Sequence, residues 1–112
     1  MTSNANNQKE GNIIYNVTLH IDHSIHSAWL QWMIEKHIVH VMASGCFTEY
    51  RMLRLLQTDE STGITYAMQY TAQNMELYNR YINDFAPAMR QEVTDTWGAL
   101  VAAFRTVMQV VH

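Results

Sequence analysis

Hydrophobic and polar positions repeat with two different periods along this chain, and the order of these periods predicts a fold. A period of two is typical of a strand with one buried face, whereas spacings of three and four are typical of an amphipathic helix. Strand, helix, strand, strand, helix and strand are predicted in turn at Ile13–Ile21, Ser24–Ala43, Phe47–Gln57, Ile64–Thr71, Asn74 to about Trp97, and Val101–Val111. This order indicates an α+β protein of ferredoxin-like βαββαβ arrangement, with an antiparallel four-stranded sheet covered by helices on one face.

The alternation within the strands predicts which side chains face the helices. In the first strand, an apolar set on one face (Ile13, Tyr15, Val17, Leu19 and Ile21) alternates with a mixed set on the other (Ile14, Asn16, Thr18 and His20). We expect the apolar set to lie beneath the helices. The open face of the sheet is then expected to collect Asn16, Thr18, His20, Gln69, Arg105 and Gln109, joined by one of Arg51 and Arg54.

The two helical regions carry apolar stripes and recognisable ends. The first stripe comprises Ile25, Trp29, Met33, Ile34, Ile38, Val41 and Met42, with Trp32 near its edge. Asp22 or Ser24 is suited to cap the first helix, and Gly45 to end it. Pro87 is expected to divide the second helical region into two pieces, because its ring removes a backbone donor.

Length and composition favour a single domain with a partner of its own kind. The 112 residues suit one core, so we expect a disordered leader over residues 1–11 and one ferredoxin-like domain over residues 12–112. Charged residues make up only 15% of the chain, which is low for a small monomer and favours a homodimer. A side of the sheet carrying Ile14, Val107 and Val111 is expected to be covered by the second copy.

Charge and cysteine content restrict the partners and the compartment. The net charge is −3 and the seven Lys and Arg residues are dispersed, which argues against nucleic-acid binding. No run approaches the length of a membrane span, and the first residues lack the apolar segment of a signal peptide. The single cysteine, Cys46, is expected to be a small buried residue, and a cytoplasmic location is predicted.

Histidine is the one enriched reactive residue type, with six copies. His20, His23 and His26 recur every three residues, and His37 and His40 lie one helical turn apart. Imidazoles at such spacings are able to bind metal ions. No Asp, Glu or Cys ligand stands at a matching distance, so no metal site and no cofactor are predicted. His20 and His37 are the candidate general bases, since imidazole titrates near neutral pH.

Several short segments resemble a known family. They are Ile13–Thr18, Trp29–Met33, His37-Ile38, Tyr50–Met52, Gly63–Tyr70, Tyr78–Tyr81, Phe85–Ala88 and Phe104–Thr106. Together they resemble a small bacterial family of unknown function of about a hundred residues, which is itself similar to the dimeric α+β barrel superfamily. The resemblance implies two ferredoxin-like protomers packed sheet against sheet, with a cavity in each half.

That superfamily includes cofactor-independent monooxygenases, haem-degrading oxygenases, isomerases and small stress proteins. The haem-degrading members use an Asn on the first strand together with a Trp and a His. Asn16 is the matching strand residue here, but the second helical region contains no histidine, so the haem ligand of that group has no counterpart.

Three functional hypotheses follow. In the first, the protein is a homodimeric small-molecule-binding protein, and a cofactor-independent enzyme of the dimeric α+β barrel type, for a small anionic or aromatic ligand. The ligand-binding candidates are Asn16, His20, Trp32, His37, Arg51, Gln69 and Arg105. In the second, it is a non-catalytic dimerisation or regulatory module, whose cavity would be filled by Tyr and Met side chains. In the third, it binds a metal ion or haem.

Overall fold

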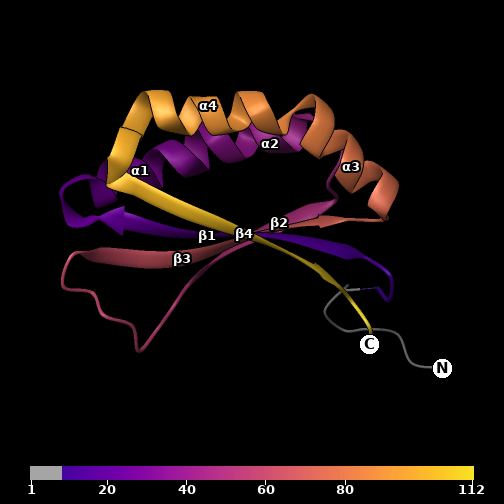
Figure 1. Cartoon of the computed structure of the whole chain (residues 1–112), viewed down its shortest axis with the longest axis horizontal. Coiled ribbons are helices and arrows are strands. Elements are labelled where there is room, and N and C mark those ends of the chain that lie inside the picture. Colours follow the sequence, from indigo (N-terminus) through magenta and orange to yellow (C-terminus); the bar gives the residue numbers. More distant parts are fainter. Residues whose placement is uncertain (1–8) are drawn as a thin grey trace.

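The computed structural model describes residues 9–112 and consists of a twisted four-stranded sheet with a helical layer on one of its faces (Figure 1). The predicted leader lies outside the described residues except for Lys9–Gly11. The strands are β1 (Ile13–Asp22), β2 (Glu49–Arg54), β3 (Gly63–Ala72) and β4 (Val101–Gln109). They are ordered β2-β3-β1-β4, and every neighbouring pair is antiparallel. The predicted βαββαβ order is therefore confirmed.

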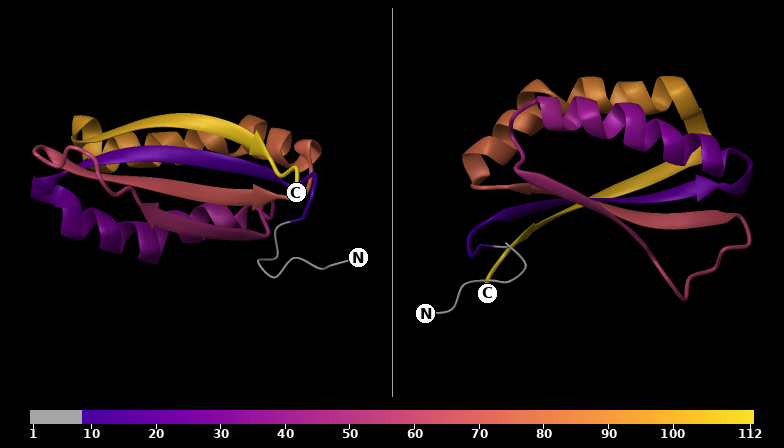
Figure 2. Two further views of the ribbon diagram at one scale, coloured as in Figure 1. Left: turned by 90° about the horizontal axis from the view of Figure 1, so that it is seen from below. Right: turned by 180° about the vertical axis from the view of Figure 1, so that it is seen from behind.

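The helical layer is built from two segments that both return across the same face of the sheet (Figures 1 and 2). The first comprises η1 (His23–Ile25), α1 (His26–Trp32), η2 (Met33–His37) and α2 (Ile38–Ala43). The second comprises α3 (Met75–Asp84), α4 (Ala86–Trp97) and the short turn η3 (Gly98–Leu100). Pro87 occupies the first turn of α4, so the predicted division of the second helical region is confirmed.

The main core lies between β1, β3 and the helices. Its largest fully buried side chains are Trp29, Ile21, Met68, Val41 and Cys46, so the predicted burial of the cysteine is confirmed. The two central strands also approach each other closely at Gly63. A Cβ atom added there would lie 2.1 Å from the carbonyl oxygen of Ile21, so only glycine fits this end of the β1–β3 pair.

The first helical region contains one turn of π-helix that the sequence pattern did not predict. In η2 the backbone N–H of Ile38 bonds to the carbonyl oxygen of Met33, a separation of five residues where an α-helix has four. The extra residue rotates the following side chains about the helix axis. Met33 and Ile38, five residues apart, are both buried, and His37 between them is 8% exposed, whereas Ile34, predicted to be in the apolar stripe, is exposed.

The face assignment of β4 was wrong. Val17 pairs with Arg105, Tyr15 with Val107, and Ile13 with Gln109. Directly paired residues share a face, so these three β4 side chains lie on the helix side and not on the open side. The open side carries Phe104, Thr106 and Met108 instead, and Val111 lies beyond the end of β4. Both alternating sets of β4 mix apolar and polar residues, so the pattern alone did not distinguish them.

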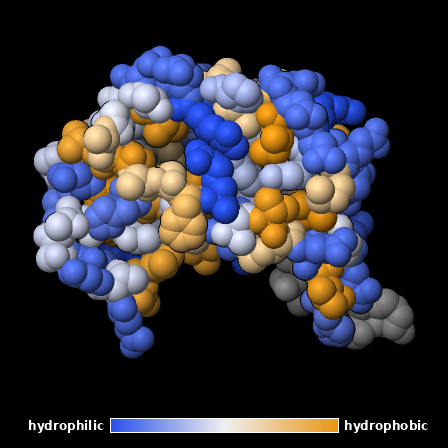
Figure 3. Space-filling model, in the orientation of Figure 1, coloured by the Kyte–Doolittle hydropathy of each residue, from blue (hydrophilic) through white to orange (hydrophobic). Residues whose placement is uncertain are grey.

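The open side of the sheet exposes large apolar side chains. Phe104 is 65% exposed, and Met108 and Leu53 are also exposed. This side is concave between the β2–β3 loop and the C-terminal end of β4 (Figure 1). In the same orientation, hydrophobic residues reach the surface of the sheet layer among the polar ones (Figure 3). Among residues 9–112, no helix is long and apolar enough to cross a membrane.

Candidate functional site

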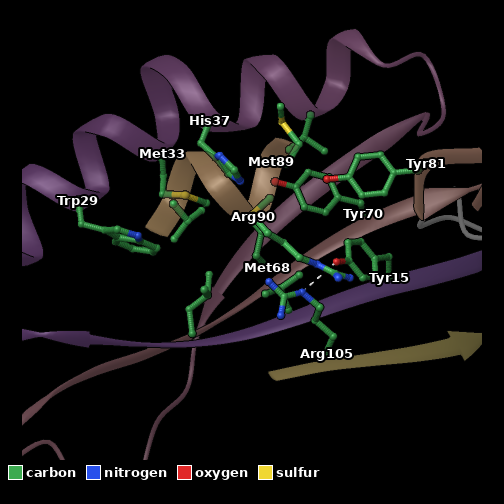
Figure 4. Close-up of a pocket in the computed structure, with 14 residues that line it drawn as sticks. Tyr15, Trp29, Met33, His37, Met68, Tyr70, Tyr81, Met89, Arg90 and Arg105 are labelled. Atoms are coloured by element: carbon green, nitrogen blue, oxygen red, sulfur yellow. Dashed lines mark hydrogen bonds between the residues drawn. The ribbon is translucent and has the colours of Figure 1, made fainter. Parts of the chain in front are cut away.

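A cavity lies between the helix-covered side of the sheet and the helices above it (Figure 4). Its lining comes from β1, β3, β4 and both helical segments: Tyr15, Val17, Leu19, Trp29, Met33, His37, Val41, Met68, Tyr70, Tyr81, Met89, Arg90, Val93 and Arg105. The space open to the centres of water molecules is about 40 Å³. At 10–15 Å³ for each water, this is room for about three waters, so a larger molecule would extend out of the cavity on the side of Arg90 and Arg105, which are exposed.

His37 is the one histidine that lines this cavity. Its Nδ1 lies 2.7 Å from Oε2 of Glu92, a residue of α4 that is 55 positions away in the chain. The other oxygen of the same carboxylate, Oε1, lies 2.6 Å from Nδ1 of His40. His37 is the last residue of the π-helical turn and faces inward, whereas His40, in α2, stays at the surface.

The contact with Glu92 fixes the tautomer of a neutral His37. An ionised carboxylate only accepts hydrogen bonds, so Nδ1 must carry the proton and donate it. The lone pair of the ring then belongs to Nε2, which has no hydrogen-bond partner among residues 9–112. A buried imidazole oriented by a carboxylate, with its second nitrogen free, is the arrangement of a general base.

The pKa directions of the pair agree with a neutral imidazole beside an ionised carboxylate. Burial lowers the pKa of His37 below 6.5, and the opposing influence of Glu92 does not restore it. Burial by itself would raise the pKa of Glu92, but hydrogen bonds from His37 and His40 outweigh it and lower that pKa. At neutral pH His37 is therefore ready to accept a proton.

Two arginines lie beside the same cavity (Figure 4). Arg105 of β4 donates from Nε to the hydroxyl of Tyr15 over 3.1 Å, which holds its guanidinium over the sheet. Arg90 of α4 faces it from the helical layer. Among the described residues, neither guanidinium is in a salt bridge with a carboxylate. Paired guanidinium groups with free N–H donors are suited to bind a carboxylate or another planar anion.

Aromatic rings and methionines form the remaining walls. Tyr15 packs against Tyr70 and Tyr81, with ring centroids 6.3 Å and 5.7 Å apart. Burial raises the pKa of both Tyr70 and Tyr81, so these phenols stay protonated. Met33, Met68 and Met89 also line the space (Figure 4). Thioether side chains adapt their shape to a bound molecule, whereas the stacked rings offer flat surfaces.

Four of the predicted ligand-binding residues lie on the open side of the sheet, away from this cavity. Arg51 donates to Gln69 over 3.2 Å, Gln69 donates to Asn16 over 3.3 Å, and Asn16 donates to Thr18 over 3.0 Å. These bonds form a continuous chain across three strands. His20, further along β1, bonds to the hydroxyls of Thr65 and Thr62.

Trp32 lies behind His37 and outside the cavity. Its ring stacks on the imidazole with ring centroids 4.9 Å apart. The ring of Trp97 lies nearly perpendicular to it, with the two tryptophan centroids 5.8 Å apart. Both tryptophans line a separate shallow groove between α1 and the end of α4. Trp32 therefore contributes to holding the His37 ring, and has no place in the cavity lining.

The spaced histidines are engaged separately. His23 Nε2 lies 2.6 Å from the carbonyl oxygen of Glu60, and His26 Nε2 lies 2.6 Å from the hydroxyl of Tyr66. Across residues 9–112, no three His, Cys, Asp or Glu side chains are grouped so that they could hold a metal ion.

Two of the predicted ligand-binding residues, His37 and Arg105, line the cavity. The sequence pattern missed Glu92, Arg90 and Tyr70. Tyr70 is an apolar-type residue at an alternating strand position, a pattern that is typical of core residues, and it pairs with Tyr15 on the helix side. Glu92 is far from His37 in the chain, so no local spacing links them.

Comparisons with known proteins identify the family of this chain. A family model described as a domain of unknown function, DUF4286, matches residues 12–111. A search of curated proteins found no match. Among solved structures, a mutant form of the cofactor-independent oxygenase SnoaB of Streptomyces nogalater is similar with a TM-score of 0.63 at 10% identity, over 89% of this chain and 94% of that one.

Two further structures show the same fold. A dimeric ferredoxin-like protein from an uncultured marine organism has a TM-score of 0.61 at 14% identity, over 90% of this chain and 96% of its own. An EthD-family protein of Bacillus halodurans has a TM-score of 0.60 at 12% identity, over 84% and 96%. Identities this low show the fold alone, and they confirm the predicted ferredoxin-like βαββαβ fold.

Proposed function

The chain belongs to the family described as domain of unknown function DUF4286, and from its own site we propose that it is a homodimeric, cofactor-independent enzyme that binds a small anionic, aromatic ligand and removes a proton from it. The observation that carries the proposal is the buried His37, held by Glu92 and lining a cavity that two arginines flank. A cytoplasmic location is part of the proposal, and the lone Cys46 supports it.

In the proposed reaction, Nε2 of His37 takes a proton from an acidic C–H group of the ligand. The electron pair of the broken bond moves into the conjugated system and onto an oxygen of the ligand, which becomes an enolate. Arg90 and Arg105 bind the anionic end and hold the ligand in position beside the imidazole. Glu92 stabilises the imidazolium that forms, since its carboxylate accepts from Nδ1 throughout.

Similarity to a cofactor-independent oxygenase supports chemistry without a resident cofactor. A substrate anion formed by a base is a reactive species in its own right, so the protein needs only to form it, stabilise it and exclude water. The surrounding Trp29, Met33 and Met68 are buried, which supplies the apolar walls that such a site requires.

We propose that the open side of the sheet is the dimer interface. Its exposed Phe104, Met108 and Leu53 form an apolar surface that a lone protomer would leave in water. The polar side chains of this surface, from Arg51 through Gln69 and Asn16 to Thr18, are hydrogen-bonded to one another. Covering them therefore leaves few polar groups without a partner. The dimeric ferredoxin-like protein from an uncultured marine organism has the same fold, which supports this assignment.

Exchange of a carbon-bound proton in D₂O tests the catalytic proposal. Phenylpyruvate is a suitable probe, since it combines an aromatic ring, a carboxylate and an acidic C–H group. We expect the protein to accelerate its deuterium exchange, followed by proton NMR, and His37→Gln to reduce the acceleration by about 10²–10⁴-fold. Arg105→Gln is expected to raise KM more than it lowers kcat.

His40→Gln is the matched control, because His40 contacts the same carboxylate but does not line the cavity. Its exchange rate should stay close to the wild-type rate. An equal loss in His37→Gln and His40→Gln would contradict the assigned base. Failure of the wild-type protein to bind or exchange the probe would favour the second candidate, a non-catalytic dimerisation module whose cavity is filled by its own Tyr and Met side chains.

A further inference from the structure

The hydroxyl group of Tyr70 is buried with no hydrogen-bond partner among the described residues. Tyr70 lies in β3, one of the two central strands, and is 2% exposed. A buried hydroxyl without a partner is costly, and proteins pair nearly all such groups. An unpaired polar group on the wall of a cavity therefore indicates a position where a bound molecule supplies the partner.

None of the described side chains around Tyr70 forms a hydrogen bond with its hydroxyl. The hydroxyl of Tyr15, the adjacent ring, is already engaged by Arg105. Phe47, which also packs on the Tyr70 ring, has no polar atom in its side chain. In Figure 4 the Tyr70 hydroxyl points toward the part of the cavity beneath His37, and the guanidinium of Arg90, which extends from α4, lies with that of Arg105 nearer the sheet.

The protonation state of Tyr70 decides the role that it is able to play. Burial, and the nearby phenols of Tyr81, Tyr15 and Tyr50, raise the pKa of this group. It therefore keeps its proton at any physiological pH and acts as a donor, not as a base. A donor of this kind selects a ligand that carries an oxygen acceptor at the matching place.

We propose that Tyr70 is a specificity-determining residue, which donates a hydrogen bond to a carbonyl or enolate oxygen of the ligand while Arg90 and Arg105 bind its carboxylate. The inference rests on the proposed function and narrows it to a substrate class. The class is that of small aromatic acids with two separate oxygen functions: a carboxylate at the arginine end, and a conjugated carbonyl group near His37. In this class, Tyr70 would stabilise the oxygen that receives charge when His37 removes a proton.

A pair of nearly isosteric probes separates this role from general packing. In 4-acetylbenzoate a carbonyl oxygen stands where 4-isopropylbenzoate has only a methyl group. We expect the wild-type protein to bind the acetyl compound more tightly in calorimetric titration. Tyr70→Phe removes one oxygen atom and is expected to weaken binding of 4-acetylbenzoate by about 5–30-fold, with binding of 4-isopropylbenzoate unchanged.

The thermal midpoint of the ligand-free Tyr70→Phe variant supplies a second readout. It should equal or exceed the wild-type midpoint, because the substitution removes an unpaired polar group. A clearly lower midpoint would mean that the hydroxyl has a structural role, and would overturn the inference. Tyr78→Phe is the control, since Tyr78 also packs on Tyr15 but does not line the cavity.

The titration distinguishes failure of this inference from failure of the proposed function. Suppose that both probes bind the wild-type protein, and that Tyr70→Phe weakens the binding of both probes equally or weakens the binding of neither. Tyr70 is then not the residue that selects an oxygen acceptor, and only this inference falls. If neither probe binds the wild-type protein, the proposed ligand class falls, and this inference falls with it. Loss of binding of both probes in Arg105→Gln, together with a selective loss in Tyr70→Phe, would support both.

Discussion

Glu92 accepts hydrogen bonds from two histidines, and the structure predicts that they contribute unequally to stability. The two contacts are similar in length, 2.7 Å to His37 and 2.6 Å to His40. They differ in exposure, because the His37 side chain is 11% exposed, the His40 side chain 45% and the Glu92 side chain 23%. If shelter from water sets the strength of such a contact, the His37 contact must be the stronger one.

The expected magnitudes follow from this difference. Hydrogen bonds to a charged group contribute about 1.5–3 kcal/mol in protected positions. Glu92 retains some contact with water, so we expect a coupling free energy near the lower end, about 1.5 kcal/mol, between His37 and Glu92. For the exposed His40 the coupling with Glu92 should be about 0.5 kcal/mol or less, since solvent screens a surface pair.

Double-mutant cycles measure both couplings against the same carboxylate. His37→Ala, His40→Ala and Glu92→Ala, with the two double variants that contain Glu92→Ala, would be unfolded in urea at about pH 7.5. Each cycle subtracts the cost of the individual truncations, including any space left behind by the His37 ring. Equal couplings, or a His37 coupling below about 0.5 kcal/mol, would refute the argument that Glu92 holds the buried imidazole in place.

Two further predictions concern the whole molecule. Sedimentation at micromolar concentration should give twice the chain mass of 13.0 kDa, and Phe104→Lys should give the single-chain mass, because Phe104 lies on the open side of the sheet. Ile34→Lys, at another exposed apolar position but in the helical layer, should remain a dimer, and a monomeric wild-type protein would contradict the proposed interface. Burial lowers the pKa of His37, so the stability that its neutral form contributes is fully present above pH 6.5 and is lost as the pH falls below that value. The urea midpoint should therefore fall less between about pH 7.5 and about pH 5.5 in His37→Gln than in the wild-type protein, and an identical fall in both would contradict the direction of the shift.

The fold was predictable from sequence because the central strands have clear patterns. In β1 every second residue is large and apolar, and the opposite set is mostly polar, so the helix-facing side could be assigned directly. The edge strand β4 offers no such contrast, since Phe104 and Val107 belong to opposite sets and both are exposed. Pairing with β1, and not the pattern, decides that Arg105 faces the helices.

The candidate site was less predictable, for two physical reasons. A π-helical turn is a local insertion with no strong sequence preference, and it changes which residues after Met33 face inward. The partners of the site also come from distant parts of the chain, as His37 and Glu92 do. Local spacing identified His37 as a candidate base, but only the position of η2 beside α4 identifies the carboxylate that orients it.

The two faces of the sheet differ in whether their polar groups already have partners. On the open side, Arg51, Gln69 and Asn16 bond to one another in sequence, so they need nothing further from a ligand. On the helix side, the hydroxyl of Tyr70 and the guanidinium of Arg90 have no such partner among the described residues. Polar groups that satisfy one another suit a surface that is to be covered by a second copy, whereas unpaired donors around a cavity suit a ligand. The same strands therefore support an interface on one side and a binding site on the other, and substitutions on the open side should alter assembly before they alter binding.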